Sequence, residues 1–207
     1  PSPPSDLVVS GDIAYVANDF DGVQIVDFSN PGIPVVVGSI ETMPRTRSIA
    51  TGDNLLFVES SGPVLNIYDI STPTNPVLLD TVGMSRIDNM YYSDSLLYVL
   101  DAGVAIVDVA RPENAVIIGY EPLDDFSLER GIAVAEGFAF VANGILGLRA
   151  IDVSKPQDPQ WVGEVAVPTD ARAAAAIEGS VLVVNGNRSR LFAIDVSDPD
   201  RPEIDSV

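Results

Sequence analysis

The sequence predicts an all-β protein, a β-propeller of five four-stranded antiparallel blades, and two observations support this prediction. The first is a phrase of apolar residues followed by an aspartate, a serine or alanine, and a proline, which occurs five times in 207 residues. The copies cover residues 22–31, 65–73, 104–112, 148–156 and 191–199. Their aspartates are 42, 39, 44 and 43 residues apart, and this period is typical of propellers and other repeat arrays.

The second observation is that each repeat consists of short apolar runs separated by turn residues. In the first repeat the runs cover residues 7–10, 13–17, 23–28 and 35–37, and Gly, Pro, Asn or Asp ends each of them. Short runs rich in β-branched and aromatic residues are typical of antiparallel strands. Some runs, such as 115–118, are apolar on both faces, as expected of a sheet stacked between two others. Four such strands per repeat indicate a propeller blade.

The repeats predict a single propeller domain over residues 1–207. The five repeats cover approximately residues 5–40, 46–82, 86–119, 130–165 and 172–207. Five whole blades are present, and no blade is shared between the two ends of the chain. Two arrangements stay open: a five-bladed ring closed by packing alone, which the end on a whole repeat favours, and part of a larger ring. The chain begins with proline, so we expect a mature form or a piece of a longer protein.

An aspartate closes the third strand of every repeat. It is followed by the pattern x-Ser/Ala-x-Pro. An Asp side chain accepts hydrogen bonds from backbone N–H groups two or three residues on, and proline fixes φ, so together they make a rigid turn. Five copies suit a repeated turn better than an active site. The sequence therefore predicts a structural role for Asp27, Asp69, Asp108, Asp152 and Asp195.

The five phrases, each preceded by an apolar strand such as residues 14–18, resemble LVIVD repeats. The resemblance covers nearly the whole chain. It implies a β-propeller of exported or cell-surface bacterial and archaeal proteins, generally without an assigned reaction. The third repeat departs most from the pattern, with Ala110 in place of serine and Ala115 in place of the second proline. We expect this departure to weaken one turn.

The composition excludes several classes of partner and chemistry. Thirty acidic against eleven basic residues give a formal charge of -19, which repels phosphate backbones and excludes nucleic acid as an expected partner. The acidity is interpreted as a solvated surface, with a high-salt habitat or weak capture of divalent cations as alternatives. The chain has no cysteine and no histidine, which removes thiol nucleophiles, the usual zinc sites and Ser-His relays. No apolar run approaches the roughly 20 residues that span a bilayer.

The loops that enter the innermost strand of each blade contain the candidate binding site. When each loop is aligned to the strand that follows, one equivalent position is occupied by Asp6, Arg47, Asp88, Arg130 and Arg172, and Arg45 and Arg86 lie close by. One hypothesis is an axial collar that binds an anionic or carboxylate-bearing ligand through bidentate guanidinium contacts. The other is that these arginines pair with neighbouring acidic residues and fix the contacts between blades.

The same loops give only weak support to a function as an enzyme. Some five-bladed propellers are glycosidases, which need two or three carboxylates at the axis. The candidate carboxylates are Asp6, Asp88, Asp124, Asp125, Glu129 and Asp170. Acidic residues are abundant throughout the chain, however, and no glycosidase motif accompanies these. Residues 18–22 contain a D-x-D-G core like part of a calcium loop, but Asn, Asp and Gly are ordinary hairpin residues, so no cofactor is expected beyond weak Ca2+ binding.

These observations favour a non-enzymatic, exported or cell-surface propeller that acts as an interaction or structural module for a protein or surface polymer. A carbohydrate-active, glycosidase-like enzyme is the first alternative. The second is a subunit of an extracellular surface assembly, in which the exposed edge strand of an outer blade pairs with another chain.

Overall fold

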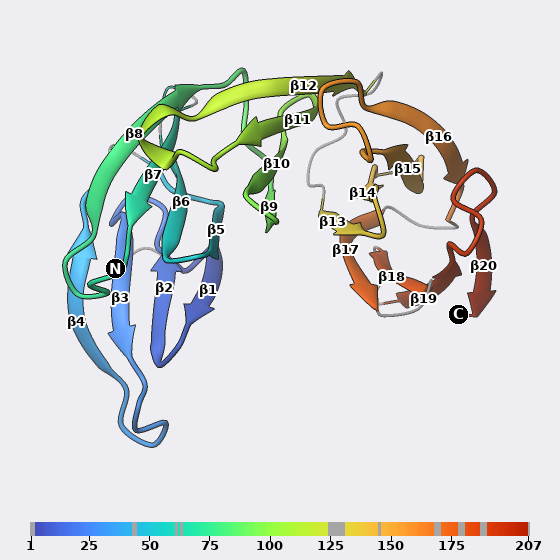
Figure 1. Cartoon of the computed structure of the whole chain (residues 1–207). Coiled ribbons are helices and arrows are strands. Elements are labelled where there is room, and N and C mark those ends of the chain that lie inside the picture. Colours follow the sequence, from blue (N-terminus) through green and yellow to red (C-terminus); the bar gives the residue numbers. More distant parts are fainter. Residues whose placement is uncertain are drawn as a thin grey trace. The chain divides into compact units, whose positions relative to one another are not determined.

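The computed structural model consists of five four-stranded antiparallel sheets (Figure 1). It describes residues 3–42, 45–60, 62, 64–123, 131–144, 146–167, 171–177, 181–186 and 190–206. Within each sheet, the order of the strands in space follows their order in the sequence. The prediction of an all-β chain of four-stranded antiparallel sheets is confirmed.

The strands of the five sheets have the following bounds. Sheet 1 contains β1 (Asp6–Ser10), β2 (Ile13–Ala17), β3 (Val23–Asp27) and β4 (Val35–Ile40). Sheet 2 contains β5 (Ile49–Gly52), β6 (Leu55–Ser60), β7 (Val64–Asp69) and β8 (Val77–Gly83). Sheet 3 contains β9 (Met90–Ser93), β10 (Leu96–Leu100), β11 (Gly103–Asp108) and β12 (Val116–Pro122). Sheet 4 contains β13 (Ile132–Ala135), β14 (Phe138–Ala142), β15 (Leu148–Asp152) and β16 (Gln160–Val165). Sheet 5 contains β17 (Ala171–Ile177), β18 (Val181–Gly186), β19 (Arg190–Asp195) and β20 (Glu203–Ser206).

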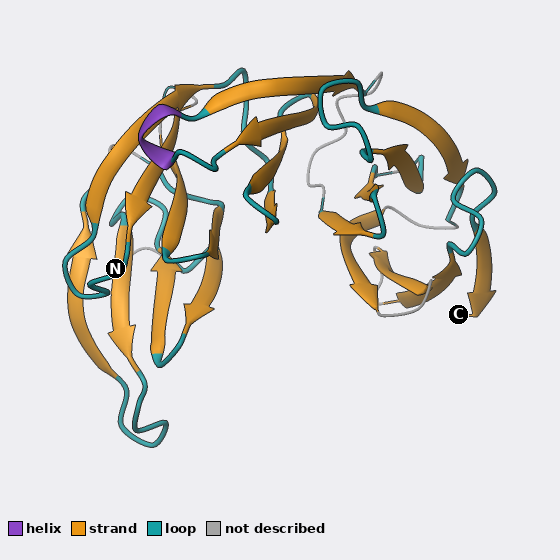
Figure 2. Ribbon diagram, in the orientation of Figure 1, coloured by secondary structure: helices purple, strands orange, loops and turns teal. Residues whose placement is uncertain are grey.

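Helical structure is limited to one short element. The 3-10 helix η1 (Pro112–Asn114) is the one helix of the described residues (Figure 2). Within that part of the chain, no helix has the length and apolar character needed to cross a membrane.

Two-residue turns connect the first and second strands of several sheets. Asp53 and Asn54 join β5 to β6 with φ angles of 48° and 61°, and Asp94 and Ser95 join β9 to β10 with φ angles of 51° and 61°. Two successive residues with positive φ are the mark of a type I′ turn, whose twist matches that of the strands on either side. The polar turn residues of the sequence therefore fix the register of these hairpins.

The chain divides into two compact units, and each has a core between stacked sheets. The first unit contains Pro1–Leu97 and Asp108–Val116, and the second contains Tyr98–Val107 and Ile117–Val207. In the first unit, side chains of sheets 1 and 2 that are fully buried pack together; they include Tyr15, Ile25, Leu56 and Val58. In the second unit, the corresponding cluster from sheets 4 and 5 includes Phe140, Leu148, Phe192 and Ile194.

The turn aspartates of all five repeats make the same contact. In each turn one carboxylate oxygen accepts a hydrogen bond from the backbone N–H of the residue two positions on, at 2.7 to 2.9 Å. The acceptors are Asp27, Asp69, Asp108, Asp152 and Asp195. The hydrogen bonds from Ser29 lower the pKa of Asp27, and those from Ser71 lower the pKa of Asp69. The repeated aspartate thus closes a repeated turn.

The fourth strand of a sheet contacts the turn of the following sheet. In sheets 1, 2 and 4 a register shift precedes Gly38, Asp80 and Gly163, which pair with Ile25, Ile67 and Ala150 of the third strand. Such a shift marks a β-bulge, which bends the strand locally. A Cβ atom on Gly163 would lie 2.3 Å from the carbonyl oxygen of Pro199, in the next turn along the chain. A close contact between backbones therefore requires glycine there.

Candidate binding surface

A cluster of charged side chains lies in the first unit, where two loops meet. One is the β2–β3 hairpin loop, residues 18–22, and the other is the connection from β4 to β5, residues 41–48. Asp19 and Thr46 form an isolated antiparallel bridge, in which the backbone N–H of Thr46 donates to the carbonyl oxygen of Asp19 at 3.0 Å. This bridge holds the hairpin of sheet 1 against the loop that enters sheet 2.

One carboxylate in this cluster faces two guanidinium groups. The Oδ1 atom of Asp19 lies 3.5 Å from Nε of Arg45 and 3.8 Å from Nε of Arg47. The side chains of the two arginines are 47% and 58% exposed, whereas that of Asp19 is 19% exposed. Two guanidinium groups therefore face one carboxylate, and Arg47 also interacts electrostatically with Glu59, in a chain whose net charge is -19.

An exposed aromatic ring adjoins the two arginines. The guanidinium carbon of Arg45 lies 4.6 Å from the centroid of the Phe20 ring, which is a cation–π contact. Phe20 is 57% exposed. We call Asp19, Phe20, Arg45 and Arg47 the arginine surface.

Hydrogen bonds to two carboxylates fix the backbone beneath the arginine surface. The Oε2 atom of Glu59 accepts hydrogen bonds from the backbone N–H groups of Arg47 and Ser48, at 3.0 and 3.1 Å. Burial raises the pKa of Glu59, and these two hydrogen bonds oppose that rise. The Oδ2 atom of Asp6 accepts from the N–H of Ile49 at 2.9 Å. Carboxylates of sheets 1 and 2 thus anchor the start of β5 and the residues before it.

Several buried polar groups lie in the same two loops. The hydroxyl groups of Thr42 and Thr46 form a hydrogen bond with each other. The Oγ atom of Ser48 and the Nδ2 atom of Asn18 are buried and lack a hydrogen-bond partner among the described residues. Gly22 is required in the hairpin because a Cβ atom there would lie 2.3 Å from the carbonyl oxygen of Ile40. The hairpin and the described part of the second loop are therefore closely packed at Gly22.

The strand register places two of the predicted collar residues one position apart. Asp6 pairs with Ala17 on β2, whereas in sheet 2 the backbone N–H of Glu59 donates to the carbonyl oxygen of Ser48. Ala17 and Glu59 each follow the valine that recurs in the second strands. Asp6 therefore corresponds to Ser48 in register, and Arg47 lies one residue earlier. Neighbouring residues of a strand point to opposite faces, so Asp6 and Arg47 do not occupy equivalent directions.

The other collar residues lie apart from the arginine surface or outside the described residues. Asp88 accepts a hydrogen bond from Nε of Arg86 at 2.5 Å. Arg172 is exposed in the second unit, at a register shift of β17 between Ala171 and Ala173. Arg130 lies outside the described residues.

Most of the candidate catalytic carboxylates lie in segments that the structure does not describe. Asp124, Asp125, Glu129 and Asp170 lie outside the described residues. Asp6 binds backbone N–H groups of Leu7 and Ile49, and Asp88 binds Arg86. Among the residues that the structure describes, no group of three or more acidic side chains could hold a metal ion. Asp19 belongs to residues 18–22, the segment that resembles part of a calcium loop, and its carboxylate faces Arg45 and Arg47.

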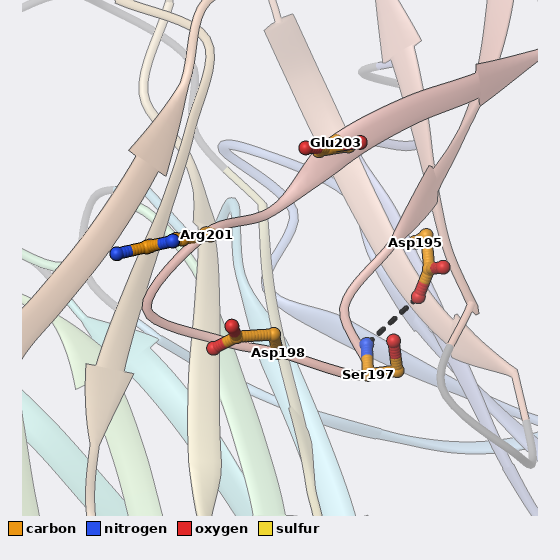
Figure 3. A pocket seen from close by; sticks show the side chains of 5 residues that line it. All are labelled: Asp195, Ser197, Asp198, Arg201 and Glu203. Carbon is orange, nitrogen blue, oxygen red and sulfur yellow. Dashed lines mark hydrogen bonds between the residues drawn. The ribbon is translucent and has the colours of Figure 1, made fainter.

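A shallow hollow of about 310 Å³ lies at the β19–β20 turn (Figure 3). The residues that line it are Asp195, Ser197, Asp198, Arg201 and Glu203. The N–H of Ser197 donates to Asp195 at 2.8 Å, which is the contact common to every turn of this kind. In Figure 3, Asp198 and Arg201 point away from Glu203 rather than toward a common centre. The hollow thus belongs to a structural turn.

Asp19 and Phe20 were not identified as site residues by the sequence. Residues 18–22 had the composition of a hairpin turn, and Asp19 is separated from Arg45 by 26 positions. A useful signal would have been topology: the hairpin after the second strand and the loop entering the next sheet lie at the same end of the strands.

Comparisons with known proteins identify the repeat and the fold. A family model described as LVIVD repeat matches residues 4–42, 45–83 and 129–167, which is more than half of the chain. This match confirms the resemblance seen in the sequence. No curated protein matches the chain.

Two solved structures show the same fold. A functionally unknown protein from Desulfotomaculum acetoxidans DSM 771 is 16% identical with a TM-score of 0.76, over 94% of this chain and 66% of its own length. The computationally designed Ika8 protein is 12% identical with a TM-score of 0.71, over 96% of this chain and 60% of its own length. The chain thus spans less than two thirds of the length of either structure. At these identities the likeness concerns the fold alone.

Proposed function

The chain belongs to the LVIVD repeat family, and from this premise we propose that it is a non-enzymatic, exported or cell-surface propeller that serves as an interaction module. The observation that carries the proposal is the arginine surface. Exposed guanidinium groups and an exposed aromatic ring are enriched where proteins bind partners, and here the backbone near them donates hydrogen bonds to the carboxylates of Glu59 and Asp6. Such a surface binds without needing a nucleophile or a general base.

The first test compares binding with turnover. The purified chain, immobilised, is exposed to the extracellular fraction of its source, and saturable binding is measured for the native chain and for Arg45→Gln/Arg47→Gln. We expect saturable binding that this double variant reduces. In parallel the chain is assayed on a panel of aryl glycosides. Turnover that is lost in Asp88→Asn would replace the proposal with the glycosidase-like alternative. Fractionation of source cells tests export, because a cytoplasmic protein contradicts it.

We further propose that the sheets are blades of a ring. Sheets 1 and 2 stack face to face, as do sheets 4 and 5, which is how neighbouring blades bury both faces. A ring closed by these five blades is the simpler arrangement, and a larger ring is supported by the greater length of the two similar structures. The intact mass of the protein isolated from its source separates them: 21.9 kDa supports five blades, and a much larger mass supports the larger ring.

A second candidate role is that of a subunit in a surface assembly, and the outer strands favour it. Val35, Val36, Val77 and Leu78 are exposed on β4 and β8, each at the edge of its sheet. Edge strands with exposed apolar residues are ready to pair with another chain. Native mass at low and high salt tests this role, since a monomer under both conditions contradicts it.

A further inference from the structure

We infer that one face of sheet 1 is a docking surface for a further four-stranded sheet of the same repeat, which lies outside these 207 residues. The face consists of Leu7, Val9, Ala14, Val16 and Val26, and we call it the open face. Leu7 pairs with Val16, and Ala14 pairs with both Val9 and Val26, and cross-strand partners lie on the same face of a sheet. The inference rests on the ring arrangement proposed above and does not involve the arginine surface.

The open face is apolar and largely uncovered within the described part of the first unit. Leu7 is 55% exposed and Val9 is 48% exposed. The opposite face of the sheet bears Tyr15 and Ile25, which are fully buried against sheet 2. Across β1, β2 and β3 the open face has no charged residue, although the net charge of the chain is -19. Both faces of sheet 1 therefore have the composition of contact surfaces.

The corresponding face of sheet 2 shows which kind of partner such a surface takes. Ile49 pairs with Val58 as Leu7 pairs with Val16, and both valines pair in turn with the residue three positions before the turn aspartate. Ile49 is only 3% exposed, because this face of sheet 2 packs against sheet 1. The open face is therefore the surface on which the preceding sheet of an array would pack. Repeat arrays bury each unit on its neighbour, so the matching partner is another sheet of this repeat.

The contact between sheets 1 and 2 also indicates what the partner should carry. Tyr15, the third residue of β2, is fully buried, and its hydroxyl donates to the carbonyl oxygen of Pro73 in the turn of sheet 2 at 3.3 Å. The third residue of the second strand is aromatic in the next three sheets and valine in the fifth: Phe57, Tyr98, Phe140 and Val183. We expect the sheet on the open face to present an aromatic ring at this position, which the fifth repeat lacks.

The two similar structures have room for such a sheet. Nearly all of this chain takes part in each match, but it covers only 66% of one structure and 60% of the other. The remainder of each structure is long enough for about two or three more repeats of roughly 42 residues. These lengths support a partner sheet in the same polypeptide over a second copy of the chain.

The experiment measures how fast an introduced thiol reacts with a maleimide. The 207 residues contain no cysteine, so Leu7→Cys reports on the open face, and mass spectrometry of the peptide that contains residue 7 follows the reaction. The variant is prepared twice, as the 207-residue chain and as the whole protein made by the source organism. We expect the thiol to react at least about tenfold more slowly in the whole protein, because a covered thiol reacts only when the contact opens.

The matched control is Ile33→Cys. Ile33 is an exposed aliphatic residue in the turn between β3 and β4 of the same sheet, outside the open face. Its thiol should react at the same rate in the two preparations, within about twofold. The ratio of the Leu7→Cys and Ile33→Cys rates in the whole protein, native against urea-unfolded, gives a second measurement that does not depend on the 207-residue chain folding alone.

Three outcomes would overturn the inference. Equal reaction of Leu7→Cys in both preparations means that no further sheet covers the open face, and the ring arrangement fails as well. Protection already present in the 207-residue chain, at the native mass of a monomer, means that the chain covers its own face, so the inference fails and a five-bladed ring stands. Protection in that chain at the mass of a dimer assigns the face to a second copy. The interaction role of Arg45 and Arg47 is judged in each case by its own binding experiment.

Discussion

The junction between sheets 2 and 3 differs from the junction between sheets 3 and 4 at one position of the outer strand. Eleven residues after the turn aspartate, β12 has Gly119, where a Cβ atom would lie 1.9 Å from the carbonyl oxygen of Pro156. At the same position β8 has Asp80, whose Oδ2 atom accepts a hydrogen bond from the N–H of Ala115 at 2.9 Å. One junction is close backbone packing, and the other is a hydrogen bond.

The difference shows that two departures from the repeat pattern compensate each other. Ala115 stands where the other repeats have Pro34, Pro76, Pro159 and Pro202. Proline has no backbone N–H, so a prolyl residue at 115 would leave the Oδ2 atom of Asp80 without this donor. The irregular third turn, which the sequence led us to regard as weakened, therefore gains a contact with the preceding sheet.

The largest effect is expected from filling the space at the glycine junctions. Gly119→Ala places a Cβ atom against a backbone oxygen, and the required shift should lower the free energy of unfolding by about 1–3 kcal/mol. Gly163→Ala, at 2.3 Å from the Pro199 oxygen, should have a similar effect. The measurement is urea unfolding followed by circular dichroism and by the fluorescence of Trp161, the single tryptophan.

Two other glycines of outer strands serve as controls for this prediction. A Cβ atom on Gly83 would meet nothing within 4 Å, and one on Gly38 would lie 3.6 Å from the Thr74 oxygen, which is an ordinary contact. Both alanine variants should unfold within about 0.5 kcal/mol of the native chain or at higher stability. If Gly119→Ala behaves like Gly83→Ala, close packing does not limit the junction between sheets 3 and 4.

The hydrogen-bonded junction is tested by a double-mutant cycle. Asp80→Gly should cost about 1–2 kcal/mol, because it removes the acceptor for Ala115 and for the N–H of Thr81. Ala115→Pro alone should cost a similar amount, because it leaves the Asp80 carboxylate without that donor. The double variant Asp80→Gly/Ala115→Pro recreates the glycine and proline of the junction between sheets 3 and 4. It should lower the free energy of unfolding by less than the two single changes added together. Additive effects in urea unfolding would show that the two positions are not coupled.

The turn aspartates should make the stability of the folded chain depend on pH. Hydrogen bonds from Ser29 lower the pKa of Asp27, and those from Ser71 lower the pKa of Asp69. A folded pKa below the unfolded one gives stability that is fully present above the ordinary carboxyl pKa of about 4 and is lost as pH falls through the lowered value. We expect Tm to fall below about pH 4, and Asp69→Asn to reduce the fall. The contribution of Glu59 to stability depends on pH in the opposite direction, because burial raises its pKa. Variants of one turn aspartate at a time therefore give a clearer comparison than the native chain alone.

The sequence predicted what short-range chemistry determines. The apolar runs around residues 13–17 and 23–28 became β2 and β3, and each turn aspartate binds a backbone N–H two residues away. Contacts set by the stacking of sheets were not visible. Asp80 and Ala115 are 35 residues apart, and only Ala115 was noted in the sequence as a departure from its repeat.

For the candidate site too, the sequence identified some residues and missed their partners from another loop. Arg47 was identified because it aligns with Arg130 and Arg172 in the loops that enter the blades, and Arg45 because it lies close by. Their partners Asp19 and Phe20 come from the neighbouring hairpin, and only the pairing of Asp19 with Thr46 brings them there. The alignment of Asp6 with Arg47 was one residue off the strand register, because the loop before β5 contains no marker that fixes where pairing begins.

The smallest expected effect concerns the third turn itself. In the first and second repeats the hydroxyl of Ser29 or Ser71 adds a side-chain hydrogen bond to the turn aspartate, whereas Ala110 offers only its backbone N–H to Asp108. Ala110→Ser should therefore raise the free energy of unfolding by about 0.5 kcal/mol, the lower end of the range for an exposed hydrogen bond. Ser71→Ala should lower it, and urea unfolding measures both. Equal stability of all three chains would mean that the backbone contact alone holds the turn, and that the third repeat lost nothing by replacing its serine.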